Sequence, residues 1–118
     1  MTPSDAVGRH PRHGLDDVIH APVRLSVVAT LSGVEKAEFS FVRDAVEITD
    51  SALSKQVAVL EQAGYVTVTK GYVGKRPRTW LALSPGGRVA FERHLAALAE
   101  IAAQAREAAG AGPGTVSV

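Results

Sequence analysis

The stretch from Ser51 to Gly87 constrains the fold most, because its apolar pattern changes from a helical to a strand period at one glycine. Leu53, Val57 and Leu60 follow one another at spacings of four and three, so they share one side of a helix. Gly64 stands where a helix commonly ends in a left-handed conformation. Directly after it, YVTVTK alternates in polarity and is rich in β-branched residues. We therefore expect a helix that is followed at once by a strand.

A second strand and a long helix are predicted next. The segment GYVGKRPR (residues 71–78) contains two glycines and a proline, which favour a long hairpin loop over regular pairing. TWLAL (residues 79–83) is expected to return as the partner strand. Ser84 and Pro85 are typical of a cap and a first helical position, and an alanine-rich helix is predicted from there to about Ala109.

Two shorter helical regions are predicted before residue 49. The first begins near Leu15 and ends at Gly33, and Pro22 either starts a new helix within it or kinks it. VEKAE (residues 34–38) is expected to be a charged connector, after which Ser40 can cap a short second helix. The residues expected to share one face of that helix are Phe41, Ala45 and Ile48.

The predicted order of elements is helix, helix, helix, strand, basic loop, strand, helix. Thr49 or Asp50 can cap the third helix, which is expected to run to about Ala63. This order predicts an α+β, mostly α fold: a winged helix-turn-helix with a two-stranded β wing and a long C-terminal helix. The expected organisation is a flexible arm, one winged-helix domain and a flexible tail, over residues 1–14, 15–109 and 110–118.

The formal net charge of +1 hides an uneven distribution of charge along the chain. Residues 1–50 contain five Lys or Arg against eight Asp or Glu, whereas residues 51–93 contain seven against two. The positive charge therefore lies on the third helix, the hairpin and the start of the last helix. This distribution indicates an anionic partner for that part of the chain.

The third helix and the hairpin offer complementary surfaces for duplex DNA. Ser51, Ser54 and Lys55 point away from the apolar stripe, and short hydrogen-bonding side chains suit a helix that enters the major groove. The hairpin contains four cations and no acid: Lys70, Lys75, Arg76 and Arg78. These cations could contact phosphates or an adjacent minor groove. Either feature alone is also typical of a solvated surface, but together they favour nucleic acid.

The segment ITDSALSKQVAVLEQAGYVTV resembles the helix–turn–recognition-helix core of winged-helix bacterial transcription regulators of the MarR and ArsR type. GKRPRTWLALSPGG is similar to the wing and post-wing segment of a small winged-helix group among them, and VIHAPVRLSVVATL resembles its first helix. The resemblance covers about residues 15–98. It implies a dimeric DNA-binding repressor or activator.

Two positions depart from the pattern of that group. Gln56 stands where the group often has His, so the resemblance implies a DNA-contacting position with an altered base preference. Ser84 stands where Thr is common, which is a conservative change.

The predicted last helix is about 37 Å long at 1.5 Å per residue, longer than one small domain can cover. An apolar stripe along it and apolar residues near the start of the first helix offer surfaces for a second copy of the chain. The residues predicted to form the dimer interface are Leu15, Val18, Ile19, Leu95, Leu98, Ala102 and Ala105. A solvated tail of high helix propensity is the alternative.

No pattern for catalysis, a cofactor or a metal is recognised. The four histidines, His10, His13, His20 and His94, have no carboxylate or cysteine beside them at a ligand spacing, and the chain has no cysteine. No nucleophile with a paired base and no phosphate-binding glycine loop is evident. We therefore predict no enzyme activity, no cofactor and no metal site, with His20 at a helix end or interface and Trp80 in the core or at the base of the wing.

The resulting hypothesis is a cytoplasmic homodimer that binds double-stranded DNA. The lack of cysteine suits a reducing compartment, and no apolar run approaches the roughly 20 residues of a membrane span. Two alternatives stay open. One is a winged-helix protein-interaction module without DNA binding, and the other is a ligand-responsive sensor with a small-molecule effector between the N-terminal helices and the last helix.

Overall fold

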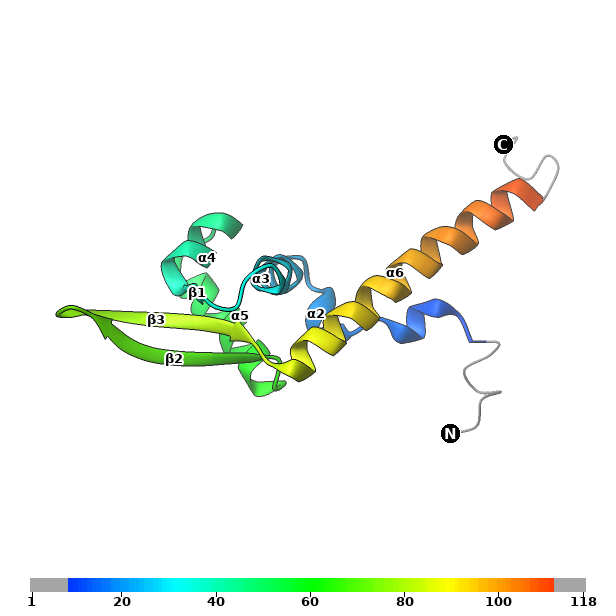
Figure 1. Ribbon diagram of the computed structural model, residues 1–118. Helices are drawn as coiled ribbons and strands as arrows, with labels where there is room; N and C mark the ends of the chain where they lie inside the picture. Colours follow the sequence, from blue (N-terminus) through cyan, green and yellow to red (C-terminus); the bar gives the residue numbers. More distant parts are fainter. Residues whose placement is uncertain (1–8, 112–118) are drawn as a thin grey trace.

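The computed structural model describes residues 9–111 and shows a helical core from which a hairpin and a helix extend in opposite directions (Figure 1). This arrangement gives the molecule extents of 67 × 37 × 21 Å. In chain order the elements are η1 (Pro11–Gly14), α2 (Asp17–His20), α3 (Pro22–Ser32), β1 (Ala37–Glu38), α4 (Phe39–Val46), α5 (Asp50–Gln62), β2 (Val66–Val73), β3 (Arg76–Leu83) and α6 (Pro85–Ala111). The winged helix-turn-helix fold, mostly helical and with a long C-terminal helix, is confirmed. No helix within residues 9–111 is long and apolar enough to cross a membrane.

The N-terminal helical region is two helices. Asp16 caps α2, since its Oδ1 accepts hydrogen bonds from the backbone N–H groups of Val18 and Ile19 at 2.9 and 3.2 Å. Pro22 is the first residue of α3, where its missing N–H has no helical partner to lose. Of the two interpretations of this proline, the new helix is therefore correct.

The region before the third helix differs from the prediction. β1 lies in the segment expected to be a connector, and it makes the sheet three-stranded, with the order β1-β3-β2. Helix α4 follows β1 directly, so its cap position is Glu38 and not Ser40. The predicted apolar face of α4 is also wrong, because Val42 is fully buried whereas Phe41 is 56% exposed. Pairing of β1 with β3 sets where α4 begins, and this shifts the face that it turns to the core.

Helix α5 agrees with its sequence pattern. Thr49 is the cap, and its Oγ1 accepts from the N–H of Ala52 at 3.1 Å. The stripe Leu53, Val57 and Leu60 is buried in the core. Gly64 follows with a φ of 81°, the left-handed conformation that was expected after the helix.

The predicted hairpin loop is wrong, because the two strands pair almost to the tip. Gly71 pairs with Arg78 and Val73 with Arg76, which leaves a two-residue turn at Gly74 and Lys75. Gly74 has a φ of 64°, as such tight turns require. The two residues of β1 pair with β3 only at Leu81 and Trp80. On that side β3 is therefore an open edge at Pro77, where a proline is tolerated because no N–H is needed for pairing.

Helix α6 begins against the end of α5. Ser84 Oγ accepts from the N–H of Gly87 at 2.9 Å and donates to the carbonyl of Gly64 at 2.6 Å. A Cβ on Gly87 would lie 2.2 Å from the carbonyl oxygen of Tyr65, so only glycine allows this approach of the two backbones.

The flexible arm predicted over residues 1–14 is corrected at its end. Residues 11–14 form a 3₁₀ turn, η1, in which Gly14 packs close to Ala97 of α6. At the other end of the chain, α6 includes residues 110 and 111 of the predicted tail. Residues 1–8 and 112–118 lie outside the described residues.

Candidate nucleic-acid interface

The outer face of α5 is polar and open to solvent. Ser51, Ser54 and Lys55 are all exposed, on the side away from the buried stripe, as the sequence predicts. A groove between α5 and the sheet is lined by Ser54, Lys70 and Thr79. The helix and the hairpin thus contribute predicted residues to one continuous surface.

Gln56 does not lie on that surface, which corrects the place expected for it. Its side chain is half-buried, and its Oε1 accepts a hydrogen bond from Arg24 Nη1 at 2.9 Å. Arg24 also donates from Nε to the carbonyl oxygen of Val18 at 2.5 Å. Gln56 therefore ties α5 to α3, and Arg24 links this contact to α2.

The hairpin presents its positive charge towards its tip. Lys70, Lys75 and Arg76 are exposed, and none of them forms an ion pair in the part of the chain that the structure describes. Residues 66–83 contain no Asp or Glu that could neutralise them. The charge of the hairpin is therefore available to an anionic partner.

Arg78 differs from the other cations of the hairpin. It lies within β3 and not at the tip, and its Nε is 3.2 Å from Glu38 Oε1 of β1. The expectation that Arg78 belongs to a hairpin loop is therefore wrong, and its charge is already partly matched by Glu38.

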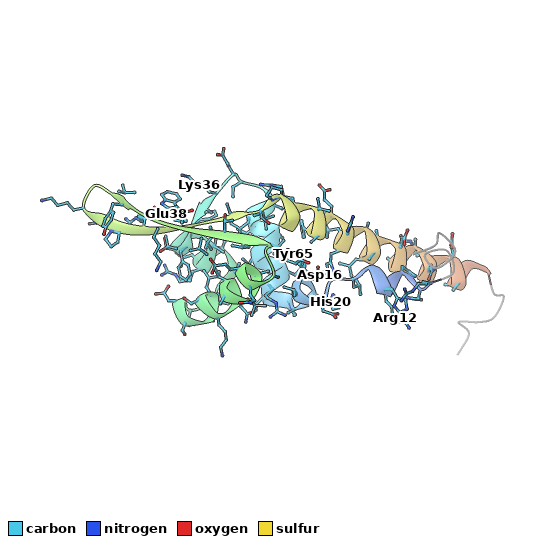
Figure 2. All side chains as sticks on the ribbon, turned by 90° about the horizontal axis from the view of Figure 1, so that it is seen from below. Arg12, Asp16, His20, Lys36, Glu38 and Tyr65 are labelled. Atoms are coloured by element: carbon cyan, nitrogen blue, oxygen red, sulfur yellow. The ribbon has the colours of Figure 1, made fainter. Side chains whose placement is uncertain are left out.

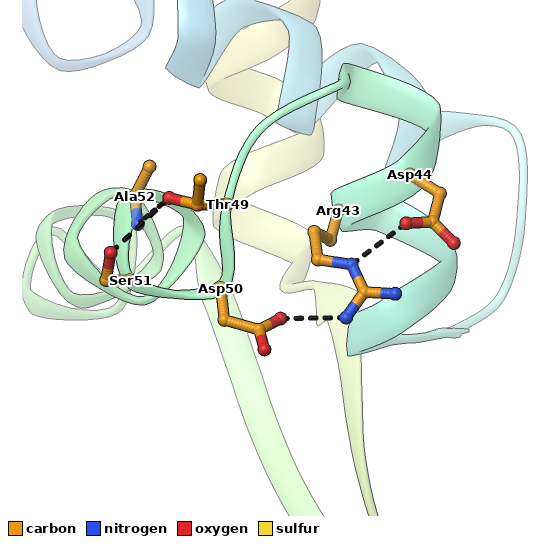
Figure 3. Close-up of polar contacts among 6 residues, drawn as sticks. All are labelled: Arg43, Asp44, Thr49, Asp50, Ser51 and Ala52. Atoms are coloured by element: carbon orange, nitrogen blue, oxygen red, sulfur yellow. Dashed lines mark hydrogen bonds and ion pairs between the residues drawn. The ribbon is translucent and has the colours of Figure 1, made fainter.

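A polar cluster at the start of α5 was not recognised from the sequence. Figure 3 shows Arg43 of α4 between two carboxylates, with Nε 2.9 Å from Asp44 Oδ1 and Nη1 2.9 Å from Asp50 Oδ1. The hydrogen bond from Arg43 holds the pKa of Asp44 below its ordinary value. Asp50 was considered only as a cap, although its place at the first position of α5 puts its carboxylate at the end of the helix that meets DNA in helix-turn-helix proteins.

A second polar junction joins three helices and was also missed. His94 of α6 is fully buried, and its Nδ1 accepts from the backbone N–H of Asp16 at 3.0 Å. Tyr65, just after α5, donates from its hydroxyl to Asp16 Oδ2 at 2.5 Å, and His20 Nδ1 lies 3.4 Å from His94 Nε2. Asp16, His20 and Tyr65 lie close together at the base of α6 (Figure 2). Burial lowers the pKa of His94, while the hydrogen bond to Asp16 raises the pKa of Tyr65.

The residues predicted for dimerisation fall into two groups. Ile19 is fully buried in the core of the chain itself, so its assignment to an interface is corrected. Leu15 and Val18 are half-buried, and Val18 packs against the same core. Along α6, Leu95 is 44% exposed and Leu98 is half-buried, whereas Ala102 and Ala105 are open to solvent. Only the α6 group offers a largely free surface.

The remaining predicted features lie away from this interface. Within residues 9–111, no three metal-ligating side chains gather in one place. Trp80 lies in β3 under the ammonium group of Lys36, whose Nζ is 4.8 Å from the ring centroid. An open hollow between η1 and α6 is lined by His10, His13 and Arg93 among others, in the region where the sensor alternative places an effector.

Comparison with known proteins identifies a family that this chain matches. Residues 23–102 match the family described as the winged helix DNA-binding domain. The uncharacterised protein MJ0432 of Methanocaldococcus jannaschii is 30% identical over 78 residues, which are 66% of this chain and 85% of that protein.

Two solved structures are similar in fold. A transcriptional regulator homologue from Pyrococcus horikoshii has a TM-score of 0.70 and 29% identity, over 74% of this chain and 86% of that one. The M. tuberculosis transcriptional regulator MosR, solved in complex with DNA, has a TM-score of 0.62 and 17% identity, over 86% of this chain and 73% of that one. The family match covers more than half of the sequence, and the chain belongs to the winged-helix DNA-binding domain family.

Proposed function

We propose that this protein is a homodimeric transcription regulator that binds duplex DNA, with α5 in the major groove and the β2–β3 hairpin on the backbone or in the adjacent minor groove. The observation that carries the proposal is the groove shared by Ser54 of α5 and Lys70 of the hairpin. It joins the polar helix face to a hairpin whose own residues, 66–83, include no acid. Asp50 and Glu61 of α5 line the same groove.

The size and chemistry of the two elements support this docking. The major groove of B-DNA admits one α-helix, and the exposed hydroxyls of Ser51 and Ser54 can donate to or accept from base edges. Lys75 and Arg76 stand at the far end of the hairpin, where they can meet phosphates beyond the reach of α5. MosR, which has the same fold, was solved with DNA, and the Pyrococcus structure is described as that of a transcriptional regulator homologue.

The proposed dimer uses the exposed part of α6. Beyond Ala97 this helix has no fully buried residue within residues 98–110, and small side chains such as Ala102 and Ala105 permit a close approach of a second helix. A symmetric dimer would place its two α5 helices on half-sites whose centres are one helical turn apart, about 10–10.5 base pairs, or a multiple of it. The hollow between η1 and α6, which is lined by apolar residues together with Arg93 and Glu100, leaves room for an effector that acts on this dimer.

The test is selection of bound duplexes from a random DNA pool, followed by titration of the selected operator and of non-operator DNA at several salt concentrations. A regulator should enrich a pseudo-palindromic sequence and bind it at least about 1,000-fold more tightly than random duplex. If no sequence is enriched and the chain binds no duplex at low salt, the proposal fails. The interaction-module hypothesis then takes its place.

A further inference from the structure

We infer that Asp50, held by Arg43, is a specificity-determining residue that accepts a hydrogen bond from the amino group of a cytosine in the operator. The inference rests on the proposed function and deepens it, because it assigns one base pair to one residue. It follows from the place of Asp50 on α5, from the hydrogen bonds of the pair and from its charge.

Asp50 lies where a recognition helix reads bases. It is the first residue of α5, and its side chain is 71% exposed. In helix-turn-helix proteins the N-terminal residues of the second helix contact base edges, while the first helix crosses the backbone. Arg43 comes from that first helix, α4, so the ion pair bridges both halves of the motif (Figure 3).

The pair offers an acceptor and donors side by side. Asp50 Oδ1 accepts from Arg43 Nη1, and an ionised carboxylate has about four lone-pair sites, so it can accept further hydrogen bonds. Arg43 uses Nε for Asp44 and Nη1 for Asp50, out of five N–H groups on the guanidinium. In the major groove a C·G pair presents the cytosine N4 amino donor next to the guanine O6 and N7 acceptors. The carboxylate matches the cytosine, and the remaining donors of Arg43 match the guanine.

Attraction to phosphates is a poor explanation for this cluster. Two carboxylates, Asp44 and Asp50, surround one guanidinium, so the cluster carries a net negative charge on a surface that would face DNA. A carboxylate near phosphates weakens sequence-independent binding. It strengthens binding only where a base amino group donates to it, which makes its contribution depend on sequence.

The experiment compares selection from a random duplex pool by the wild-type protein, Asp50→Asn and the matched control Asp44→Asn. Both variants remove one carboxylate charge from Arg43, but only Asp50 lies on α5. We expect the wild type to require a C·G pair at one position in each half-site, with a discrimination of about 5- to 100-fold over the other pairs. Asp50→Asn should lose this requirement or shift it towards adenine, the base that Asn prefers. Asp44→Asn should keep it.

The outcomes separate this inference from the proposed function. If the wild type selects an operator and Asp50→Asn selects the same bases at every position, the inference fails and the regulator proposal stands. If both variants only strengthen binding to all DNA by the same factor, the carboxylates act through charge alone, which also overturns the inference. If the wild type selects nothing, both proposals fail. Equal unfolding transitions of the three proteins show that the comparison concerns DNA contacts and not folding.

Discussion

The hairpin and the distal part of α6 both leave the core, in opposite directions, yet their surfaces differ in kind (Figure 1). The exposed end of the hairpin is basic, with Lys70, Lys75 and Arg76 and no acid in residues 66–83. Residues 98–110 of α6 contain two Glu, one Arg and seven Ala or Gly. A concentration of positive charge fits an anionic partner, whereas a nearly neutral surface of small residues fits close packing against another helix.

The two regions are also anchored differently. The hairpin continues from a sheet whose base is apolar, with Val66, Leu81 and Leu83 buried in the core. Helix α6 is joined to the core partly by the polar junction of His94 and Asp16. The strength of apolar packing hardly depends on pH, whereas a contact made by a neutral histidine is weakened when the histidine takes up a proton. The comparison therefore predicts that mutations and pH affect the two regions in distinguishable ways.

The largest effect is expected from Ala102→Glu with Ala105→Glu. Two added carboxylates on the proposed contact face would repel their symmetry mates, so light scattering should report a monomer. Operator affinity should fall by at least about 100-fold, because a protein with two linked binding units binds more tightly than a single unit by that factor or more. The matched control is Ala103→Glu with Gln104→Glu, which adds the same charge on the opposite, exposed side of α6. A doubly substituted protein that stays dimeric would place the interface elsewhere.

The next largest effect is expected from Lys75→Ala with Arg76→Ala at the hairpin tip. Lost phosphate contacts weaken operator and random duplex alike, by roughly tenfold or more at low salt, and reduce the salt slope by about two. Arg106→Ala, which removes a cation from α6, serves as the control.

Lys55→Ala on α5 should instead weaken binding to the operator more than binding to random duplex, by about 1–3 kcal/mol for a good base contact. Titration at several salt concentrations measures all of these effects, and identical slopes for wild type and the hairpin variant would rule out the hairpin as a phosphate contact.

The features that could be predicted from the sequence are those that depend on residue patterns over short stretches of chain. The helix–strand change at Gly64 and the buried stripe of α5 follow from periodicity within about ten residues, and both are confirmed. β1 was missed because two residues are too few to show alternation. The hairpin loop was predicted wrongly because a proline that usually ends pairing was tolerated at an open edge of β3.

The candidate site shows the same limit. The exposed face of α5 could be predicted because it is opposite the apolar stripe, whereas the partner of each polar side chain could not. Gln56 meets Arg24 across 32 positions of sequence, and Asp16 meets His94 across 78. Such pairs depend on how helices cross in space, which no local spacing encodes.

A pH effect is expected at the base of α6. The folded chain holds the pKa of His94 below its ordinary value of 6.5, so the unfolded chain takes up the proton first as the pH falls. Stability is therefore fully present above about pH 6.5 and is lost below it, by an amount on the order of one buried hydrogen bond, about 1 kcal/mol.

Chemical denaturation between pH 7 and 5 measures this effect. His94→Gln does not titrate and should show a flatter dependence over that range. His20→Gln removes the exposed neighbour of His94 Nε2 but keeps the buried histidine, so it should change the dependence less. The same dependence in wild type and His94→Gln would show that another group controls the change.

The smallest effect is expected from Gln56→Ala, and it tests the boundary between the DNA-facing side of α5 and its inner side. Gln56 accepts from Arg24 at a half-buried position, so its loss should lower the free energy of unfolding by about 1 kcal/mol because a guanidinium N–H loses its partner. Because the side chain lies off the outward face, the base preference in a selection experiment should stay that of the wild type. Ser54→Ala, on the exposed face of the same helix, should do the reverse: unchanged stability and weaker operator binding. A changed base preference in Gln56→Ala at one operator position would instead support the contact implied by the family resemblance, because the side chain would then have to leave Arg24 when DNA binds.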